Sequence, residues 1–574
     1  MINTVKRQSD FFELPTMRRR FVLLILLGLF FTLFSRAVYI QGMQKDFLQK
    51  EGGNRSNRIE KLHAYRGRIL DRNNYVFAVS TPVETISANP IDVVITKEQR
   101  NKLASILDLN PIDLERRLQK KDTRFVYLKK QMSPEKAAQI MALKIPGIRS
   151  EKEYKRAYPL KEIAAHVIGF SGDDGNGQEG IELFANKLLA GEAGYKKILQ
   201  DRAGRIVDDL QDVKVPRDGQ DIILSIDSRL QDKAYRALEK AVEDHAAISG
   251  SAILLDAKSG EILAMTNYPS YNPNAKRSST EFLRNRSVTD IFEPGSTIKP
   301  ITVSAALENK SITPRTIIDT SAGYYSVGRS QVRDTHNNGK ISVKEVIQKS
   351  SNIGAILIGL NVQPKNLWDT LNGFGFGTKT GINFPGEASG RLIDYKDWGK
   401  TTQISTSYGY GLSSSLIQLA QSYTVFANQG EIKPVSIIKK EDPAIGRRVI
   451  SKKTSNEMLD MMESVVSEGT ALQAKVNGYR VAGKTGTARK IVDGQYESKY
   501  IGSFVGVAPV SDPRFVLAIM IDEPTQGGYY GGVVAGPAFS EIMAEALKIY
   551  SIPQDGFTDE STSIKKEAEP DRII

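Results

Sequence analysis

The longest run of hydrophobic residues lies near the N-terminus of the chain. From Phe21 to Phe34 there is no charge, and hydrophobic positions continue to Ile40 with Arg36 as the one charged residue. A helix of about 20 residues crosses the hydrocarbon core of a bilayer, and an arginine near its end can reach the headgroups. The pattern predicts a membrane-spanning helix over 21–40.

The charges before this run predict its orientation. Lys6, Arg7 and the arginines at 18–20 favour a cytoplasmic N-terminus, residues 1–20, because basic flanks tend to stay on that side. A cleaved signal peptide is the alternative, since Ser35-Arg36-Ala37 resembles a small-x-small cleavage site. In both interpretations the rest of the chain is exported across the membrane.

After the hydrophobic run, the chain shows a mixture of strand-like and helical patterns. Residues 41–65 are polar and predict a juxtamembrane stalk, whereas 66–216 combine short strand-like runs with charged helical segments such as 111–120. We assign 41–220 to this stalk and a mixed α/β pedestal domain.

A second unit, 221–550, begins with a new pattern. Residues 222–226 predict a strand, and 227–245 carry hydrophobic positions at helical spacing. A helix is also expected near 537–550. Four strands pair as hairpins by length and turn sequence: 251–256 with 261–266, and 501–510 with 514–521.

Hairpins at both ends of a helical middle predict a central antiparallel sheet flanked by helices in this unit. The chain as a whole is expected to be an α+β multidomain protein. Its polar end, 551–574, is expected to be disordered.

The amino-acid composition limits the kinds of active site that the chain can have. The 574 residues suggest at least two folded units, and Lys plus Arg exceed Asp plus Glu, 78 against 66. This balance favours anionic surfaces such as lipid headgroups, and no nucleic-acid-binding motif is present. The lack of cysteine excludes disulfides and a thiol nucleophile. The four histidines have no metal-ligand spacing, so we expect neither metal nor cofactor.

Candidate chemistry begins in the segment 293–300. Ser296 and Lys299 are three residues apart, which on a helix places both side chains on one face, close enough for the amine to accept the hydroxyl proton. Pro294-Gly295 predicts a turn just before the helix. Free backbone N–H groups at a helix start suit an oxyanion.

Two further motifs follow in a typical order. Ser350-Ser351-Asn352 lies 54 residues after Ser296, and Lys484-Thr485-Gly486-Thr487 lies 134 residues after Ser350. The ordered set is typical of penicillin-binding proteins and class A β-lactamases. Any one of the motifs alone is better explained as a helix cap, a surface lysine or a turn.

Decoys of each motif occur in the chain. Ser133–Lys136 and Ser563–Lys566 share the first spacing without such a turn. Lys379-Thr380-Gly381 repeats the third motif, but it lies between glycine-rich turns and is rejected in favour of Lys484.

The residue types predict roles. A lysine at its ordinary pKa of about 10.4 is protonated at pH 7, so Lys299 can act as a base only if burial and a second cation, Lys484, lower its pKa. We expect Ser350 to pass the proton to the leaving amine and Asn352 to hold the substrate amide.

The third motif is expected to bind the substrate terminus. Lys484 with Thr485 and Thr487 suits a terminal carboxylate. The backbone N–H groups of Ser296 and Thr487 are the expected oxyanion hole.

One competing motif is a dinucleotide fingerprint at Gly175–Gly180. Asp173, Asp174, Glu179 and Glu182 surround it and would repel a pyrophosphate. A tight loop is the favoured interpretation.

Other segments carry a family resemblance. Arg66–Asn73 is similar to the N-terminal signature of class B penicillin-binding proteins, and Arg156–Pro159 with Ala165–Phe170 is typical of their non-catalytic pedestal. Asn74 departs from the usual glycine, a change that asparagine tolerates because it accepts left-handed conformations.

Three segments resemble the septal branch of this family, the penicillin-binding protein 3 type: Phe384–Glu387, Ser407–Leu412 and Tyr529–Pro537. The resemblance implies a transpeptidase domain on a pedestal, held by an uncleaved anchor in the inner membrane with the catalytic domain in the periplasm. It also implies that Tyr529 and Tyr530 line the pocket; simple packing is the alternative.

The implied reaction is acylation of Ser296 by D-Ala-D-Ala stem peptides, loss of D-Ala and transfer to a neighbouring stem amine. β-Lactams would acylate the same serine. The implied partners are a glycosyltransferase of the SEDS family and other division proteins.

Three other functions are alternatives to a septal transpeptidase. A β-lactam sensor would carry several membrane spans and a cytoplasmic effector, and a hydrolytic β-lactamase would be shorter and have no pedestal. An elongation-type wall transpeptidase stays open, because only the septal-branch segments argue against it.

Overall fold

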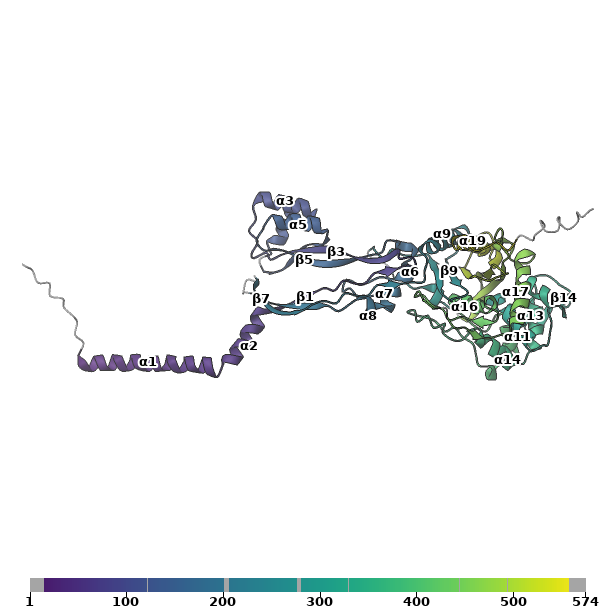
Figure 1. Ribbon diagram of the computed structural model, residues 1–574, viewed down its shortest axis with the longest axis horizontal. Helices are drawn as coiled ribbons and strands as arrows, with labels where there is room; N and C mark the ends of the chain where they lie inside the picture. Colours follow the sequence, from purple (N-terminus) through teal and green to yellow (C-terminus); the bar gives the residue numbers. More distant parts are fainter. Residues whose placement is uncertain are drawn as a thin grey trace, which may run out of the picture.

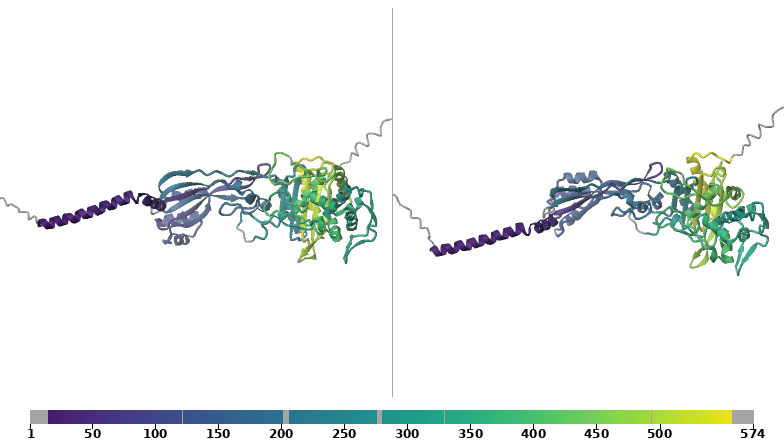
Figure 2. Two further views of the ribbon diagram at one scale, coloured as in Figure 1. Left: turned by 90° about the horizontal axis from the view of Figure 1, so that it is seen from below. Right: turned by 60° about the horizontal axis from the view of Figure 1, so that its bottom comes forward.

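Helix α1 (Thr16–Gly42) leads into the pedestal through α2 (Lys45–Ser56), and the chain ends in a C-terminal domain (Figure 1). The computed structural model describes residues 15–556 apart from 121, 201–205, 276–279, 329, 443 and 493. Helix, pedestal and C-terminal domain keep this order along the molecule in both further views (Figure 2).

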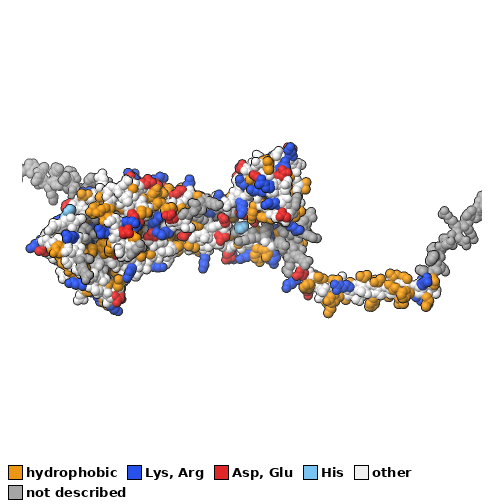
Figure 3. Space-filling model, turned by 180° about the vertical axis from the view of Figure 1, so that it is seen from behind, with side chains coloured by type: hydrophobic (Ala, Val, Ile, Leu, Met, Phe, Trp, Pro, Cys, Tyr) orange, Lys and Arg blue, Asp and Glu red, His pale blue; other side chains and the backbone are white. Residues whose placement is uncertain are grey.

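Helix α1 is long and apolar enough to cross a membrane. Its 27 residues have a mean hydropathy of 2.3 in the most apolar window, and none of that window is buried. Hydrophobic side chains cover it along its length (Figure 3). The helix extends the predicted 21–40 at both ends and runs unbroken through the alternative cleavage site at Ser35–Ala37.

The pedestal contains two sheets. The strand order of one is β1-β6-β7, and that of the other is β4-β3-β2-β8, with β5 also paired to β3. The strands are β1 (Asn57–Leu62), β2 (Ile69–Leu70), β3 (Val76–Ala88), β4 (Val126–Met132), β5 (Ile148–Ala157), β6 (Gly194–Gln200), β7 (Ile206–Lys214) and β8 (Ile222–Ile223). Short helices lie between them: η1 (Lys161–Ile163), α6 (Ala165–Ile168), α7 (Gly180–Phe184) and α8 (Asn186–Leu189).

Three helices form a head on one end of this sheet. They are α3 (Lys97–Leu107), α4 (Pro111–Leu118) and α5 (Pro134–Ala142), and they share a separate hydrophobic core with β3 and β4. Local caps begin them, because Thr96, Asn110 and Ser133 each accept a hydrogen bond from a backbone N–H of the first turn. Ser133, a decoy of the first motif, is therefore a helix cap.

Buried charges join distant parts of the pedestal. Glu182 is fully buried and accepts hydrogen bonds from Arg66 Nε at 2.7 Å and Arg156 Nε at 2.6 Å. The predicted loop at Gly175–Gly180 lies beside this cluster, where the Gly175 carbonyl accepts from Arg66. Asn74 has a φ of 66°, which agrees with the expected left-handed conformation.

The C-terminal domain is built on one antiparallel sheet of strand order β10-β9-β19-β18-β17. Helices α9 and α19 lie above this sheet and α16 below it (Figure 1). The strands are β9 (Ser249–Asp256), β10 (Ile262–Tyr268), β17 (Ala482–Val492), β18 (Gln495–Ala508) and β19 (Phe515–Asp522). The three helices are α9 (Ser228–Asp244), α16 (Leu416–Ala427) and α19 (Gly536–Ile549).

The middle of this domain is mostly helical. Its helices are α10 (Arg286–Thr289), η2 (Gly295–Ile298), α11 (Lys299–Glu308), α12 (Val343–Gln348), α13 (Asn352–Leu360), α14 (Pro364–Gly373), η3 (Tyr395–Asp397), α15 (Lys400–Ser407), α17 (Lys452–Ser467) and η4 (Leu472–Ala474). The short helix α18 (Gly531–Val534) follows the last strand of the sheet, β19. Small hairpins join β11 (Ile317–Asp319) to β14 (Lys340–Ser342), β12 (Tyr324–Val327) to β13 (Ser330–Arg333), and β15 (Glu431–Ile432) to β16 (Arg447–Arg448).

The structure differs from the predicted pattern at two places. Only residues 222 and 223 of the strand expected at 222–226 form a strand, β8, which pairs with β2 of the pedestal sheet; Leu224 then bridges to Ile438. Residues 551–556 are not a free tail, because Asp555 accepts hydrogen bonds from the backbone of Arg480 and Ser511. Residues 557–574 of the predicted tail, and 1–14 at the other end, lie outside the described residues.

Removing the carboxylate of Glu182 is expected to destabilise the pedestal strongly. Glu182→Ala leaves two buried guanidinium groups without their anion, which costs about 3–5 kcal/mol. Asp113→Ala breaks an exposed pair with Arg116 in the head and should cost at most about 1 kcal/mol. Urea unfolding of the full chain, followed by circular dichroism, measures both; equal losses for the two variants would contradict the expectation.

Candidate active site

Ser296 lies in a tight turn at the start of α11. Gly295 has a φ of 56°, a left-handed conformation that suits glycine, and its N–H donates to the Gly409 carbonyl at 3.0 Å. The turn is the 3-10 segment η2, which continues directly into α11 at Lys299. The predicted helix start is therefore one turn of 3-10 helix, and the three-residue spacing is kept.

Lys299 reaches the second motif from α11. Its side chain is fully buried, and Nζ donates to the Ser350 carbonyl at 2.5 Å, to Asn352 Oδ1 at 2.7 Å and to Ser350 Oγ at 3.2 Å. Ser350 has a φ of 58°, so the chain turns sharply just before α13 begins at Asn352. The first two motifs thus form one hydrogen-bonded cluster.

Lys484 joins the same cluster from β17. It is also fully buried, and its Nζ lies 2.9 Å from Ser350 Oγ. The hydroxyl of Ser350 is therefore contacted by two amines, one from α11 and one from β17.

Burial lowers the pKa of both lysines. The pKa of Lys299 falls from 10.5 to about 7, mainly because the charged form loses its hydration, and the Asp334 carboxylate opposes this fall. The pKa of Lys484 lies well below its ordinary value because of burial first and the neighbouring Lys299 second. The cluster therefore holds an amine that can be neutral near pH 7.

The strand β17 passes close to the Ser296 turn. A Cβ on Gly486 would lie 3.0 Å from the Pro294 carbonyl oxygen and would collide with Ser503 Oγ, so only glycine fits there. Thr487 Oγ1 accepts from the Gly531 N–H at 3.2 Å. Thr485 Oγ1 lies 2.9 Å from Thr470 Oγ1. The third motif thus lies on the edge strand β17, beside the turn in which Ser296 begins its helix.

Tyr529 and Tyr530 pack beside this edge. The ring of Tyr529 stacks on Tyr500 with centroids 4.0 Å apart and contacts Tyr530 at 4.7 Å. Arg489 lies over the Tyr500 ring at 5.9 Å. The ring contacts found for these tyrosines within the described residues are with each other and with Tyr500, not with Lys299 or Lys484.

Three supporting residues were not predicted from the sequence. Asp334 accepts from the N–H groups of Asn352 and Ile353 at 2.5 and 3.1 Å, and from Ser351 Oγ at 2.5 Å. Asp334 therefore caps α13 and fixes the turn at Ser350.

The other two support the Ser296 turn. Glu293 accepts from the Gly411 N–H at 2.8 Å and from Tyr496 Oη at 3.0 Å, and burial raises its pKa. The buried Tyr423 of α16 donates to the Thr297 carbonyl at 2.9 Å. Nothing in the local sequence marks these residues, since their partners are distant along the chain.

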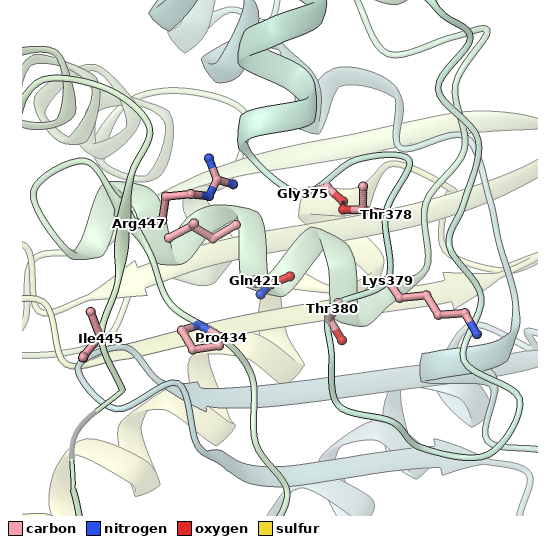
Figure 4. A pocket seen from close by; sticks show the side chains of 9 residues that line it. Gly375, Thr378, Lys379, Thr380, Gln421, Pro434, Ile445 and Arg447 are labelled. Atoms are coloured by element: carbon pink, nitrogen blue, oxygen red, sulfur yellow. Dashed lines mark hydrogen bonds between the residues drawn. The ribbon is translucent and has the colours of Figure 1, made fainter.

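The rejected motif Lys379–Gly381 lies elsewhere. Thr380 donates from its N–H and its hydroxyl to Glu387, each at 2.6 Å, which makes the segment a turn. Lys379 and Thr380 line a surface pocket with Gln421 and Arg447 (Figure 4).

Family models match both parts of the chain. The penicillin-binding protein transpeptidase domain matches residues 250–544, and the penicillin-binding protein dimerisation domain matches 61–224.

Curated relatives match nearly the whole chain. The probable peptidoglycan D,D-transpeptidase PenA of Neisseria gonorrhoeae is 41% identical over 543 residues, 93% of each chain. The peptidoglycan D,D-transpeptidase FtsI of Escherichia coli is 39% identical over 551 residues, 94% of this chain and 93% of that protein.

Solved structures match as well. Penicillin-binding protein 3 of Mycobacterium tuberculosis in complex with aztreonam has a TM-score of 0.68 at 27% identity, covering 86% of this chain and 98% of that one. The transpeptidase domain of Burkholderia pseudomallei penicillin-binding protein 3 has a TM-score of 0.54 at 45% identity, covering 58% and 97%.

The chain therefore belongs to the class B penicillin-binding proteins, with a pedestal that matches the family's dimerisation domain. Within that class it is a serine D,D-transpeptidase of the penicillin-binding protein 3 type, which confirms the resemblance seen in the sequence.

Lys299 is expected to titrate near pH 7. Lysine labelled with ¹³C should give one Cε resonance with a pKa of about 7, which Lys299→Met removes. Lys365→Met should instead remove a resonance whose pKa lies above the usual lysine value, because the Asp369 carboxylate binds that amine. The unfolded chain holds the Lys299 proton up to about 10.5 and the folded chain releases it near 7, so Lys299 makes stability rise with pH between these values. Titration of Lys299 near 10 would contradict the expectation.

Proposed function

We propose that this protein cross-links peptidoglycan stem peptides at the division septum through an acyl-enzyme on Ser296. The observation that carries the proposal is the Ser350 hydroxyl, which lies within hydrogen-bond distance of both Lys299 and Lys484. This arrangement gives a proton path between a base beside the nucleophile and the edge strand that would hold the substrate terminus.

The chemistry follows from these contacts. Ser296 Oγ attacks the carbonyl carbon of the penultimate D-Ala, and its proton passes to Nζ of neutral Lys299. The resulting oxyanion is held by the N–H groups of Ser296 and Thr487. When the C–N bond breaks, the proton reaches the leaving D-Ala amine through Ser350 Oγ. The acceptor amine then attacks the ester, and its proton returns to the Ser296 oxygen.

Four residues orient the donor peptide in this proposal. Asn352 holds the substrate amide with the side chain that also binds Lys299. Lys484 and Thr485 bind the terminal carboxylate, together with the Thr487 hydroxyl. Gly486 allows the strand to approach, and Tyr529 and Tyr530 border the open side of the cleft.

β-Lactams are proposed to acylate the same serine. Penicillin-binding protein 3 of Mycobacterium tuberculosis forms complexes with aztreonam and with ampicillin. The present chain shares that fold and matches the penicillin-binding protein transpeptidase domain over residues 250–544, which supports the extension.

Helix α1 is proposed to be an uncleaved single anchor in the inner membrane, with residues 1–20 in the cytoplasm and the catalytic domain in the periplasm. The arginines at 18–20 support this orientation. The continuous helix through Ser35–Ala37 supports retention, because it offers no break at the alternative cleavage site. A SEDS-family glycosyltransferase and other division proteins are the proposed partners.

Ser296→Ala is expected to abolish covalent labelling by a fluorescent penicillin, because the other hydroxyl of the η2 turn, that of Thr297, is buried and donates to the Pro294 carbonyl at 2.8 Å. Ser133→Ala, which changes the helix-cap decoy, should label at the wild-type rate. Gel fluorescence of the purified full chains measures both. Persistent labelling of the Ser296 variant would refute the acyl-enzyme.

Depletion of the protein in its native host is expected to give long filaments without septa, because cross-linking at the septum would stop while elongation continues. Microscopy of depleted cells measures this. Round cells would instead support an elongation-type transpeptidase, and expression of the Ser296→Ala chain during depletion should fail to restore division.

A further inference from the structure

Three loops of the head meet at the end of the pedestal nearest α1 (Figures 1 and 2). Residue Ala88 at the end of β3 pairs with both Val126 at the start of β4 and Ile148 at the start of β5. The loops next to these positions, 89–96, 119–125 and 143–147, therefore adjoin one another. We call this surface the head tip.

Large hydrophobic side chains are exposed at the head tip. Val94 is 74% exposed, Phe125 52%, Ile91 47% and Tyr127, which follows directly in β4, 45%. The rings of Phe125 and Tyr127 meet edge to face with centroids 4.7 Å apart. Such a cluster on an exported domain indicates a contact surface, because single exposed hydrophobic residues are usual and gathered ones are not.

The head tip is also basic. Among the residues that the structure describes, its three loops carry Lys120, Arg124 and Lys144 against Asp92 and Asp122. Lys120 and Lys144 are exposed and form no ion pair with any residue that the structure describes. Lys and Arg side chains gather over the head in the space-filling view (Figure 3). The charge therefore complements an anionic partner.

Aromatic rings beside flexible cations are the composition of a membrane-interface contact. A ring with a polar tip lies at the level of the headgroups, and a lysine stem lies along apolar surface while its ammonium reaches anionic phosphates. The head tip lies at the end of the pedestal that faces α1 (Figure 1), which favours the bilayer that α1 crosses over a partner elsewhere.

We propose that the head tip docks on the outer surface of the bilayer that α1 crosses and binds its anionic headgroups. This proposal rests on the proposed anchoring by α1. The docked head gives the pedestal a second attachment to the membrane, so that the pedestal is held at a fixed tilt rather than swinging on α2.

Because the chain has no cysteine, one introduced cysteine can carry a fluorophore. The full chain is reconstituted into nanodiscs of phosphatidylcholine with phosphatidylglycerol, some of it nitroxide-labelled in the headgroup. Label at Val94→Cys should be quenched strongly, whereas label at Ile445→Cys, 93% exposed on the C-terminal domain, should not. A fluorophore at Leu48→Cys in α2 should be quenched whenever α1 is inserted in the bilayer, so it reports anchoring independently of the head tip.

A charge test distinguishes headgroup binding from mere proximity. The double variant Lys120→Glu, Lys144→Glu should weaken docking about fivefold for each lysine reversed. Nanodiscs of pure phosphatidylcholine, which lack anionic headgroups, should also weaken docking of the unchanged chain. The matched variant Lys396→Glu, Lys400→Glu makes the same change in net charge on exposed residues of the C-terminal domain and should leave quenching at residue 94 unchanged.

The outcomes separate the two proposals. Quenching at residue 48 without quenching at residue 94 would overturn the docking and keep the anchor. Loss of quenching at both positions would overturn the anchor and the docking with it. Quenching at residue 94 only after a second membrane protein is added, or unchanged quenching in the lysine double variant, would also overturn the lipid contact.

Discussion

Two buried amines share one hydroxyl, and the rest of the catalytic domain is arranged around that contact. Lys299 and Lys484 both reach Ser350 Oγ, at 3.2 and 2.9 Å, and neither side chain contacts a carboxylate among the described residues. Burying two positive charges this close is unfavourable, so the cluster loses a proton more readily than free lysines do. A neutral amine beside Ser296 follows from this repulsion and burial, without an external base.

Close backbone approach makes the cluster possible. Glycines let the backbone come close to the Ser296 turn at two places. Gly486 lies where β17 passes the turn, and the carbonyl of Gly409 accepts a hydrogen bond from the Gly295 N–H. Ser350 takes a left-handed conformation without being glycine, and Asp334 stabilises it by binding the N–H groups that start α13. The geometry therefore depends on a carboxylate that takes no part in the proposed proton path.

The sequence predicted those helices, strands and motifs that depend on residues close together in the chain. The helix at 227–245, the strand pairs of the central sheet and the three motifs needed only periodicity, turns and spacing. Glu293, Asp334 and Tyr423 could not be found in this way, because each matters only through a partner brought close by the fold. The strand expected at 222–226 was too long for the same reason: its apolar residues serve the pedestal sheet first and a bridge to Ile438 next.

The pedestal is joined to the catalytic domain by buried polar contacts rather than by a free linker. Asp71 is fully buried and accepts from the N–H and hydroxyl of Ser228 at the start of α9, at 3.1 and 2.8 Å, while Arg72 pairs with Glu261 at 3.3 Å. Buried hydrogen bonds to charged groups have strict geometry and are costly to break, so the two parts should move as one body. The orientation that the pedestal takes at the membrane then also fixes the direction in which the Ser296 cleft faces. A rigid pedestal serves a membrane-anchored transpeptidase, because its substrate is a polymer that must be met at a defined height and angle.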